Sequence, residues 1–200
     1  MTLKLAEKEG ILANPAPLGL MGFGMTTVLL NIHNTYPNDA ATFGLNTMIL
    51  AMGIFYGGLA QIIAGILEFR KGNTFGVTAF TSYGLFWMSL VFLLILPDIV
   101  GVQGPSETFM GWYLFMWGFF TMMMFVGTLR KNLALSLIFS TLFVLFYLLA
   151  LKDWGIISGG WIGIEGIICG FSAIYLAMAE VINDSFGRII LPIGKPLLKK

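Results

Sequence analysis

Charged residues are scarce in this sequence. Only 10% of its 200 residues are Asp, Glu, Lys or Arg, whereas 58% are hydrophobic and the mean hydropathy is +0.88. A soluble domain carries roughly 25% charged residues, so most of the surface of this chain cannot face water. The net charge is +1 and no basic stripe is present, which argues against a nucleic-acid partner. The composition predicts an integral membrane protein.

Cysteine and histidine are nearly absent as well. The single cysteine, Cys169, excludes a disulfide within the chain, and the single histidine, His33, leaves no cluster of metal ligands. No serine has the setting of a nucleophile elbow with a histidine at the same depth. We therefore expect no enzymatic activity, no metal and no cofactor. His33, at the end of the first apolar segment, fits either an exposed interfacial residue or a pH-sensing group.

Long apolar segments, by contrast, fill most of the chain. A helix of about 20 apolar residues crosses a bilayer, and these segments are apolar on all sides, which favours helices over strands. We predict an all-α membrane protein with six transmembrane helices in one domain, 14–183, between the tails 1–13 and 184–200. The six segments are about 16–32, 40–67, 74–96 (stopped by Pro97 and Asp98), 109–129, 133–151 and 160–182.

Lysine and arginine are distributed very unevenly over the predicted loops. With six crossings, one side of the membrane holds both tails and the loops at Arg70–Lys71 and Arg130–Lys131. Of the 11 basic residues, all except Lys152 then lie on that side. Because cytoplasmic loops are rich in Lys and Arg, both termini are predicted to be cytoplasmic. We expect a multi-pass protein of the cell membrane (the inner membrane in a Gram-negative source).

Glycines recur at steps of four in the second and sixth segments. Gly53, Gly57 and Gly65 form one series with Gln61, and Gly166 and Gly170 belong to another. Small residues at this spacing let helices approach closely in lipid. They indicate packing either within the chain or between subunits.

The start of the first segment has an unusual composition. Asn14 is a favourable N-cap residue, Pro15 suits the first helical position, and Pro17 lies within the first turn. The positive end of the helix dipole would face incoming anions, with Asn14, Ala16 and Leu18 offering polar contacts. Either a well-made helix start or an anion-binding mouth explains this pattern.

Polar residues within the apolar segments are uncharged. They are costly in lipid and usually face a cavity or a partner, so Thr26, Thr27, Asn46, Gln61 and Thr81 are candidate lining residues. We expect an interfacial ion pair of Glu68 with Arg70 or Lys71 rather than a proton carrier, and we place Glu165 near the outer interface. Such a lining suits a small, weakly polar solute better than a metal cation.

These features resemble the acetate uptake transporter family, which includes bacterial succinate–acetate permeases. The resemblance covers nearly the whole chain and is weakest in the connections of the fourth, fifth and sixth segments. It rests on Asn14–Leu20 (NPAPLGL), Gly22–Asn34 (GFGMTTVLLNIHN), Ala51–Gln61 (AMGIFYGGLAQ), Gly72–Gly84 (GNTFGVTAFTSYG), Cys169–Ala177 (CGFSAIYLA), Glu180–Asn183 and Phe186–Gly194 (FGRIILPIG).

The resemblance implies a homohexamer in which each protomer has its own path for acetate and, in some members, succinate. It implies an apolar constriction made by Phe23, Tyr83 and Leu142, with Ala173 also lining the path. Because a bare carboxylate loses its hydration there, we hypothesise that the neutral acid crosses, so that transport looks proton-coupled without a dedicated carrier carboxylate. A channel for a small neutral solute such as urea, an amide or water is the alternative.

Overall fold

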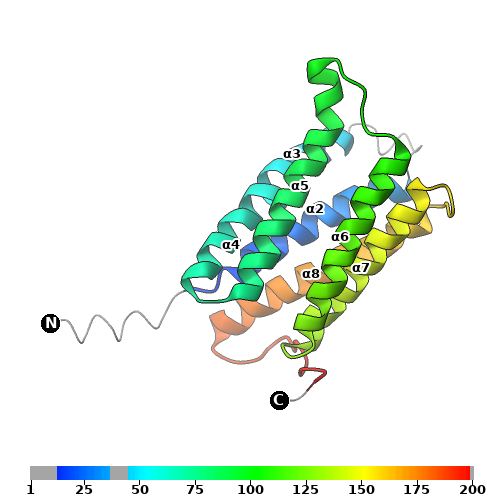
Figure 1. Ribbon diagram of the computed structural model, residues 1–200. Helices are drawn as coiled ribbons and strands as arrows, with labels where there is room; N and C mark the ends of the chain where they lie inside the picture. The colour runs from blue at the N-terminus through cyan, green and yellow to red at the C-terminus, as the bar shows by residue number, and fades with distance from the viewer. Residues whose placement is uncertain (1–12, 37–44, 199–200) are drawn as a thin grey trace.

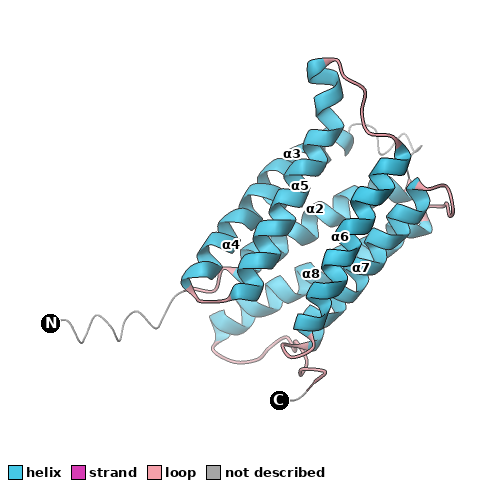
Figure 2. Cartoon of the chain, viewed as in Figure 1, coloured by secondary structure: helices cyan, strands magenta, loops and turns pink. Residues whose placement is uncertain are grey.

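The computed structural model describes residues 13–36 and 45–198, and this part of the chain is a bundle of helices without strands (Figures 1 and 2). The predicted all-α fold is confirmed. The elements are α2 (Ala16–Thr35), α3 (Leu45–Ile54), the π-helix η2 (Phe55–Ala60), α4 (Gln61–Arg70), α5 (Thr74–Val100), α6 (Glu107–Thr128), α7 (Leu133–Asp153) and α8 (Trp161–Phe186).

Five of the described helical segments are long and apolar enough to cross a bilayer. They are α5, α6, α7, α8 and the continuous run from α3 through η2 to α4, described from Thr47 to Arg70. The remaining long helix, α2, has 20 residues, and many of them, including Gly, Thr and Asn residues, are buried. It packs against α8, α4, η2 and α3 inside the bundle, so its surface need not be as apolar as that of a lipid-facing helix.

The second span is not a uniform α-helix. Six residues, Phe55–Ala60, form a π-helix between α3 and α4. Such an insertion changes which residues share a face, and it is frequent at functional sites. The sequence predicts a helix over about 40–67 and gives no sign of the insertion.

The glycine spacing is explained by packing within the chain. A Cβ on Gly24 in α2 would lie 2.7 Å from the carbonyl oxygen of Gly170 in α8, and a Cβ on Gly170 would lie 2.8 Å from that of Gly24. Gly166 faces the side chain of Asn31, and Gly65 faces Thr81. These glycines allow close approach of helices in one protomer, so they are not subunit contacts.

The third segment extends beyond the predicted stop. Helix α5 continues through Pro97 to Val100 and ends at Gly101, which has the left-handed conformation (φ 68°) and donates its N–H to the Pro97 carbonyl. Proline has no backbone N–H, so it disrupts a helix most when it lies in the interior. Pro97 lies in the last turn of α5, where only one hydrogen bond is lost. Glycine adopts the left-handed C-cap without a Cβ penalty, so Gly101 ends the helix.

One end of the bundle collects the start of α2, the α4–α5 and α6–α7 connections, and the C-terminal segment after α8 (Figure 1). The Nζ of Lys71 donates to Asn14 Oδ1 at 2.8 Å, and the N–H of Leu198 donates to the Leu129 carbonyl at 2.8 Å. Arg130 and Lys131 also lie in these connections. We call this the basic end; that it faces the cytoplasm stays a prediction.

Candidate functional site

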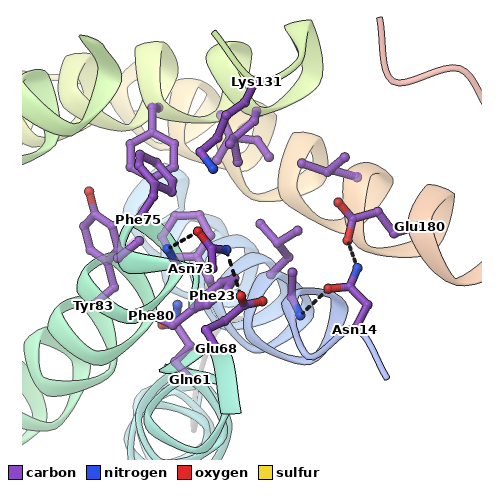
Figure 3. A pocket seen from close by; sticks show the side chains of 18 of the residues that line it. Asn14, Phe23, Gln61, Glu68, Asn73, Phe75, Phe80, Tyr83, Lys131 and Glu180 are labelled. Carbon is purple, nitrogen blue, oxygen red and sulfur yellow. Dashed lines mark hydrogen bonds between the residues drawn. The ribbon is translucent and has the colours of Figure 1, made fainter. Parts of the chain in front are cut away.

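A cavity of about 270 Å³ extends from the basic end into the bundle between α2, α4, α5, α7 and α8 (Figure 3). Its mouth is polar and its interior is mostly apolar. The mouth is formed by Asn14, Lys71, Asn73, Lys131, Asn132 and Glu180, and the wall includes Leu20, Phe23, Gln61, Glu68, Phe75, Ala79, Phe80, Tyr83, Leu135, Ile138, Phe139, Leu142 and Leu176.

Three residues expected to form a constriction line this one cavity. Phe23, Tyr83 and Leu142 come from α2, α5 and α7, and each has at most 5% of its surface exposed. The ring centroids of Phe23 and Tyr83 are 6.1 Å apart, and the Tyr83 hydroxyl donates to Thr121 Oγ1 at 2.9 Å. The phenol is therefore fixed by a hydrogen bond while its ring faces the other apolar side chains.

Ala173 does not belong to the cavity lining. It is fully buried in α8, and the wall there is formed instead by Leu176, three residues later. Ala173 shares the buried core with Phe23, Tyr83 and Leu142 but does not line the cavity, so its place along the path stays a prediction.

The opening segment of α2 contributes less to the cavity than expected. Asn14 and Ala16 line it, whereas Pro15, Pro17 and Leu18 do not. The prediction that Asn14 is the N-cap is wrong, because Pro15 occupies that position and accepts the N–H of Leu18 at 3.1 Å.

The Asn14 side chain instead connects three parts of the protein. Its Nδ2 donates to Glu180 Oε2 at 2.7 Å, and its Oδ1 accepts from Lys71 Nζ at 2.8 Å and from the Ala16 N–H at 3.3 Å. The residue therefore ties the start of α2 to α8 and to the α4–α5 connection at the mouth (Figure 3).

Among the predicted polar lining residues whose side chains the structure describes, only Gln61 is found at the cavity. It is 1% exposed, and its Oε1 accepts no hydrogen bond from the described residues. Thr26 donates to the Gly22 carbonyl at 2.7 Å, Thr27 is buried elsewhere on α2, and Thr81 packs against Gly65. The side chain of Asn46 lies outside the described residues.

Glu68 is the site residue whose position the sequence analysis misjudges. The expected ion pair with Lys71 is present, with 3.8 Å between Lys71 Nζ and Glu68 Oε1, but the Glu68 side chain is fully buried in the cavity wall. Its Oε2 accepts from Asn73 Nδ2 at 2.7 Å. The spacing in the sequence could have indicated this position. Glu68 follows Gln61 by seven residues, or two helical turns, and therefore lies on the same face of the helix as Gln61.

The charges that line the cavity are balanced. Glu68 and Glu180 supply two carboxylates, Lys71 and Lys131 supply two ammonium groups, and the Lys131 Nζ also lies 4.8 Å from the centroid of the Phe75 ring. A mouth of this kind can admit a small anion and exchange its hydration for hydrogen bonds. The apolar interior favours the same molecule when it is uncharged.

Comparison with known proteins places this arrangement in a family. Residues 4–195 match the model of the GPR1/FUN34/yaaH family. The chain is 57% identical to the succinate-acetate/proton symporter SatP of Escherichia coli over 192 residues, covering 92% of this chain and 96% of that protein. It is 34% identical to acetate permease A of Emericella nidulans, covering 91% and 66%.

A solved structure agrees with both the fold and the sequence. The structure of the bacterial acetate channel SatP superposes with a TM-score of 0.85 at 56% identity, covering 92% of this chain and all of that one. The helical bundle described above is therefore shared with that channel. The chain belongs to the GPR1/FUN34/yaaH family of membrane proteins.

Proposed function

We propose that the protein transports small monocarboxylic acids, chiefly acetate, across the cell membrane. The observation that carries the proposal is the cavity itself, whose charged mouth leads to an apolar interior lined by Phe23, Tyr83 and Leu142, where we propose that the path narrows. Its volume of about 270 Å³ suits a short-chain acid. The names of the relatives, a succinate-acetate/proton symporter and an acetate channel, support the same substrate class.

The chemistry of the narrowing indicates which form of the acid passes. Removing a carboxylate from water without full compensation costs several kcal/mol or more, whereas the neutral acid has only one hydroxyl and one carbonyl to satisfy. We therefore propose that acetate passes Phe23 and Tyr83 as acetic acid. Each molecule then carries one proton, and flux falls as the pH rises.

Flux into proteoliposomes tests this function. Radiolabelled acetate uptake above that of protein-free liposomes should be competed by unlabelled acetate but not by urea, and it should acidify the lumen without generating current. Acetate current without proton movement contradicts passage of the neutral acid. Uptake of urea with no competition by acetate would identify the alternative, a channel for small neutral solutes.

We also propose that the protein is a homohexamer with one path in each protomer, as the family resemblance implies. The cavity supports the second part, because the helices of a single chain enclose it. Native mass spectrometry in detergent measures the assembly directly. Six copies are expected, and a stable monomer would contradict the assembly while leaving the path intact.

A further inference from the structure

Glu68 lies in the cavity wall in a place prepared for its carboxyl group. A Cβ on Gly76 in α5 would lie 2.9 Å from both Cγ and Cδ of Glu68, so only glycine leaves room for this side chain. Asn73 holds Oε2 by a hydrogen bond of 2.7 Å. Glutamate near the end of a transmembrane helix ordinarily extends toward water, but this one is turned into the protein (Figure 3).

The second oxygen of the carboxyl group has an ion-pair contact but no hydrogen bond among the described residues. Glu68 Oε1 is buried and makes no hydrogen bond within the described residues; Lys71 Nζ, at 3.8 Å, is its ion-pair partner. Burying a carboxylate is costly unless it is paired and hydrogen-bonded, so a group left half satisfied beside a cavity suggests a role for a ligand.

Charged side chains of both signs line the cavity together with Glu68. Lys71, Lys131 and Glu180 are the other charged residues of the lining, and the other polar residues at the mouth, Asn14 and Asn132 among them, are uncharged. Lys71 also donates to Asn14 Oδ1 at 2.8 Å, so its ammonium is shared rather than committed to Glu68. Asn73 Nδ2 can donate to the carbonyl oxygen of the neutral form as well as to the carboxylate.

We propose that Glu68 exchanges a proton with the substrate inside the cavity. When acetate enters from the basic end, the O–H bond of the Glu68 carboxyl breaks as a new O–H bond forms on the bound acetate. The products are acetic acid and a Glu68 carboxylate. When acetic acid arrives from the opposite end and has passed the narrowing, it returns the proton to the Glu68 carboxylate. Acetate then leaves at the basic end, past Lys71 and Lys131. Water at the mouth then exchanges protons with Glu68. This proposal rests on the proposed function and assigns the proton-transfer step to one residue.

The test compares Glu68→Gln with the wild-type protein in proteoliposomes at about pH 5 and about pH 7.5. Near pH 5 neutral acetic acid is abundant and can enter without help, so flux should fall less than about threefold. At pH 7.5 acetate that enters from the basic end must gain its proton at the protein, so flux in that direction should fall at least about tenfold. Acetamide is a neutral molecule of nearly the same shape, and its flux through Glu68→Gln should stay close to that of the wild-type protein at both pH values. Glu107→Gln, an exposed carboxylate at the far end, is the matched control and should change neither flux.

Equal losses of acetate flux at the two pH values, or wild-type flux at pH 7.5, overturn the proposal, since a merely structural role does not depend on pH. If Glu68→Gln does not yield folded protein by size-exclusion chromatography, Glu68→Asp replaces it. The shorter carboxyl group lies farther from Lys71, so the acetate flux of this variant should again fall more at pH 7.5 than at pH 5. An equal fall at the two pH values overturns the proposal. Absence of wild-type acetate flux at pH 5 would instead refute the proposed function.

Discussion

Phe23, Tyr83 and Leu142 illustrate how single side chains from distant parts of the sequence form one element of a site. Each comes from a different helix and each is almost completely buried. Tyr83 also lies within 6.0 Å, ring centroid to ring centroid, of Phe139. These side chains line the same cavity, and we propose that their size limits what can pass.

Truncating the narrowing should broaden selectivity. Leu142→Ala and Phe23→Ala each remove buried volume, and both should increase lactate flux relative to acetate flux while lowering the free energy of unfolding by about 2–5 kcal/mol. Uptake of labelled lactate and acetate into proteoliposomes measures the ratio. Leu137→Ala, at a half-exposed position of α7, is the control and should leave the ratio unchanged. Unchanged selectivity in both variants would show that the narrowing lies elsewhere.

We expect the Gln61 side chain to contact the substrate during transport and, in the absence of substrate, to lower the stability of the fold. Its Oε1 is buried without a hydrogen-bond partner among the described residues, which costs about 1–3 kcal/mol. Gln61→Met, of similar shape, should therefore raise the melting temperature and lower acetate flux. Gln103→Met, at an exposed loop position, should change neither. A Gln61→Met protein with full flux would argue that the amide has no contact with the substrate.

The helices depend on small residues where they cross. Helix α2 packs along α8 with Gly24 and Gly170 at the closest approach, and η2 places Gly57 against Thr26 and Trp87. Because apolar burial does not drive association in lipid, this close contact between backbones holds α2 at the centre of the bundle. The position of Phe23, one residue from Gly24, follows directly from that contact.

A methyl group at the crossing of α2 and α8 should therefore be damaging. Gly170→Ala places its Cβ against the Gly24 carbonyl, which cannot move without shifting the helix, and we expect a loss of about 1–3 kcal/mol in stability. Thermal unfolding in detergent, followed by intrinsic fluorescence, measures the change. Ile168→Ala, at an exposed position of the same helix, should cause a much smaller shift. Equal melting temperatures for the two variants would contradict this account of the packing.

At the scale of the whole molecule, charge is concentrated at one end. The basic end carries both the cavity mouth and the loops with Arg70, Lys71, Arg130 and Lys131, whereas the opposite end has Lys152. Cytoplasmic loops are enriched in basic residues, so the cavity should open toward the cytoplasm. The proton and the acid would then be released on that side during uptake.

Labelling of introduced cysteines checks the orientation. With the native Cys169 fully buried, Ile156→Cys in the α7–α8 connection should react with a membrane-impermeant maleimide on intact cells. Arg130→Cys, exposed in the α6–α7 connection, should react only after the membrane is permeabilised. The reverse pattern would place the cavity mouth outside the cell and invert the direction proposed for uptake.

Sequence reasoning predicted the elements better than it predicted the directions of side chains. Hydropathy located all six helices, and their ends moved by a few residues, as with Pro97, because a proline is tolerated in a last turn. The π-helix at Phe55–Ala60 has no periodic signature in a uniformly apolar segment. Asn14 looked like a cap because its type is typical of caps, but contacts with Lys71 and Glu180, far away in the chain, decide its role.

The sequence by itself determined that the chain spans a membrane, which end is basic, and, through its motifs, the family to which it belongs. Those properties depend on composition and local order, which folding does not alter. Only the tertiary structure decided that Phe23, Tyr83 and Leu142 share one cavity, that Ala173 and Thr81 stay outside it, and that Glu68 turns inward. Such facts depend on how helices rotate against one another, and that rotation is set by contacts such as Gly24 with Gly170 and Gly76 with Glu68.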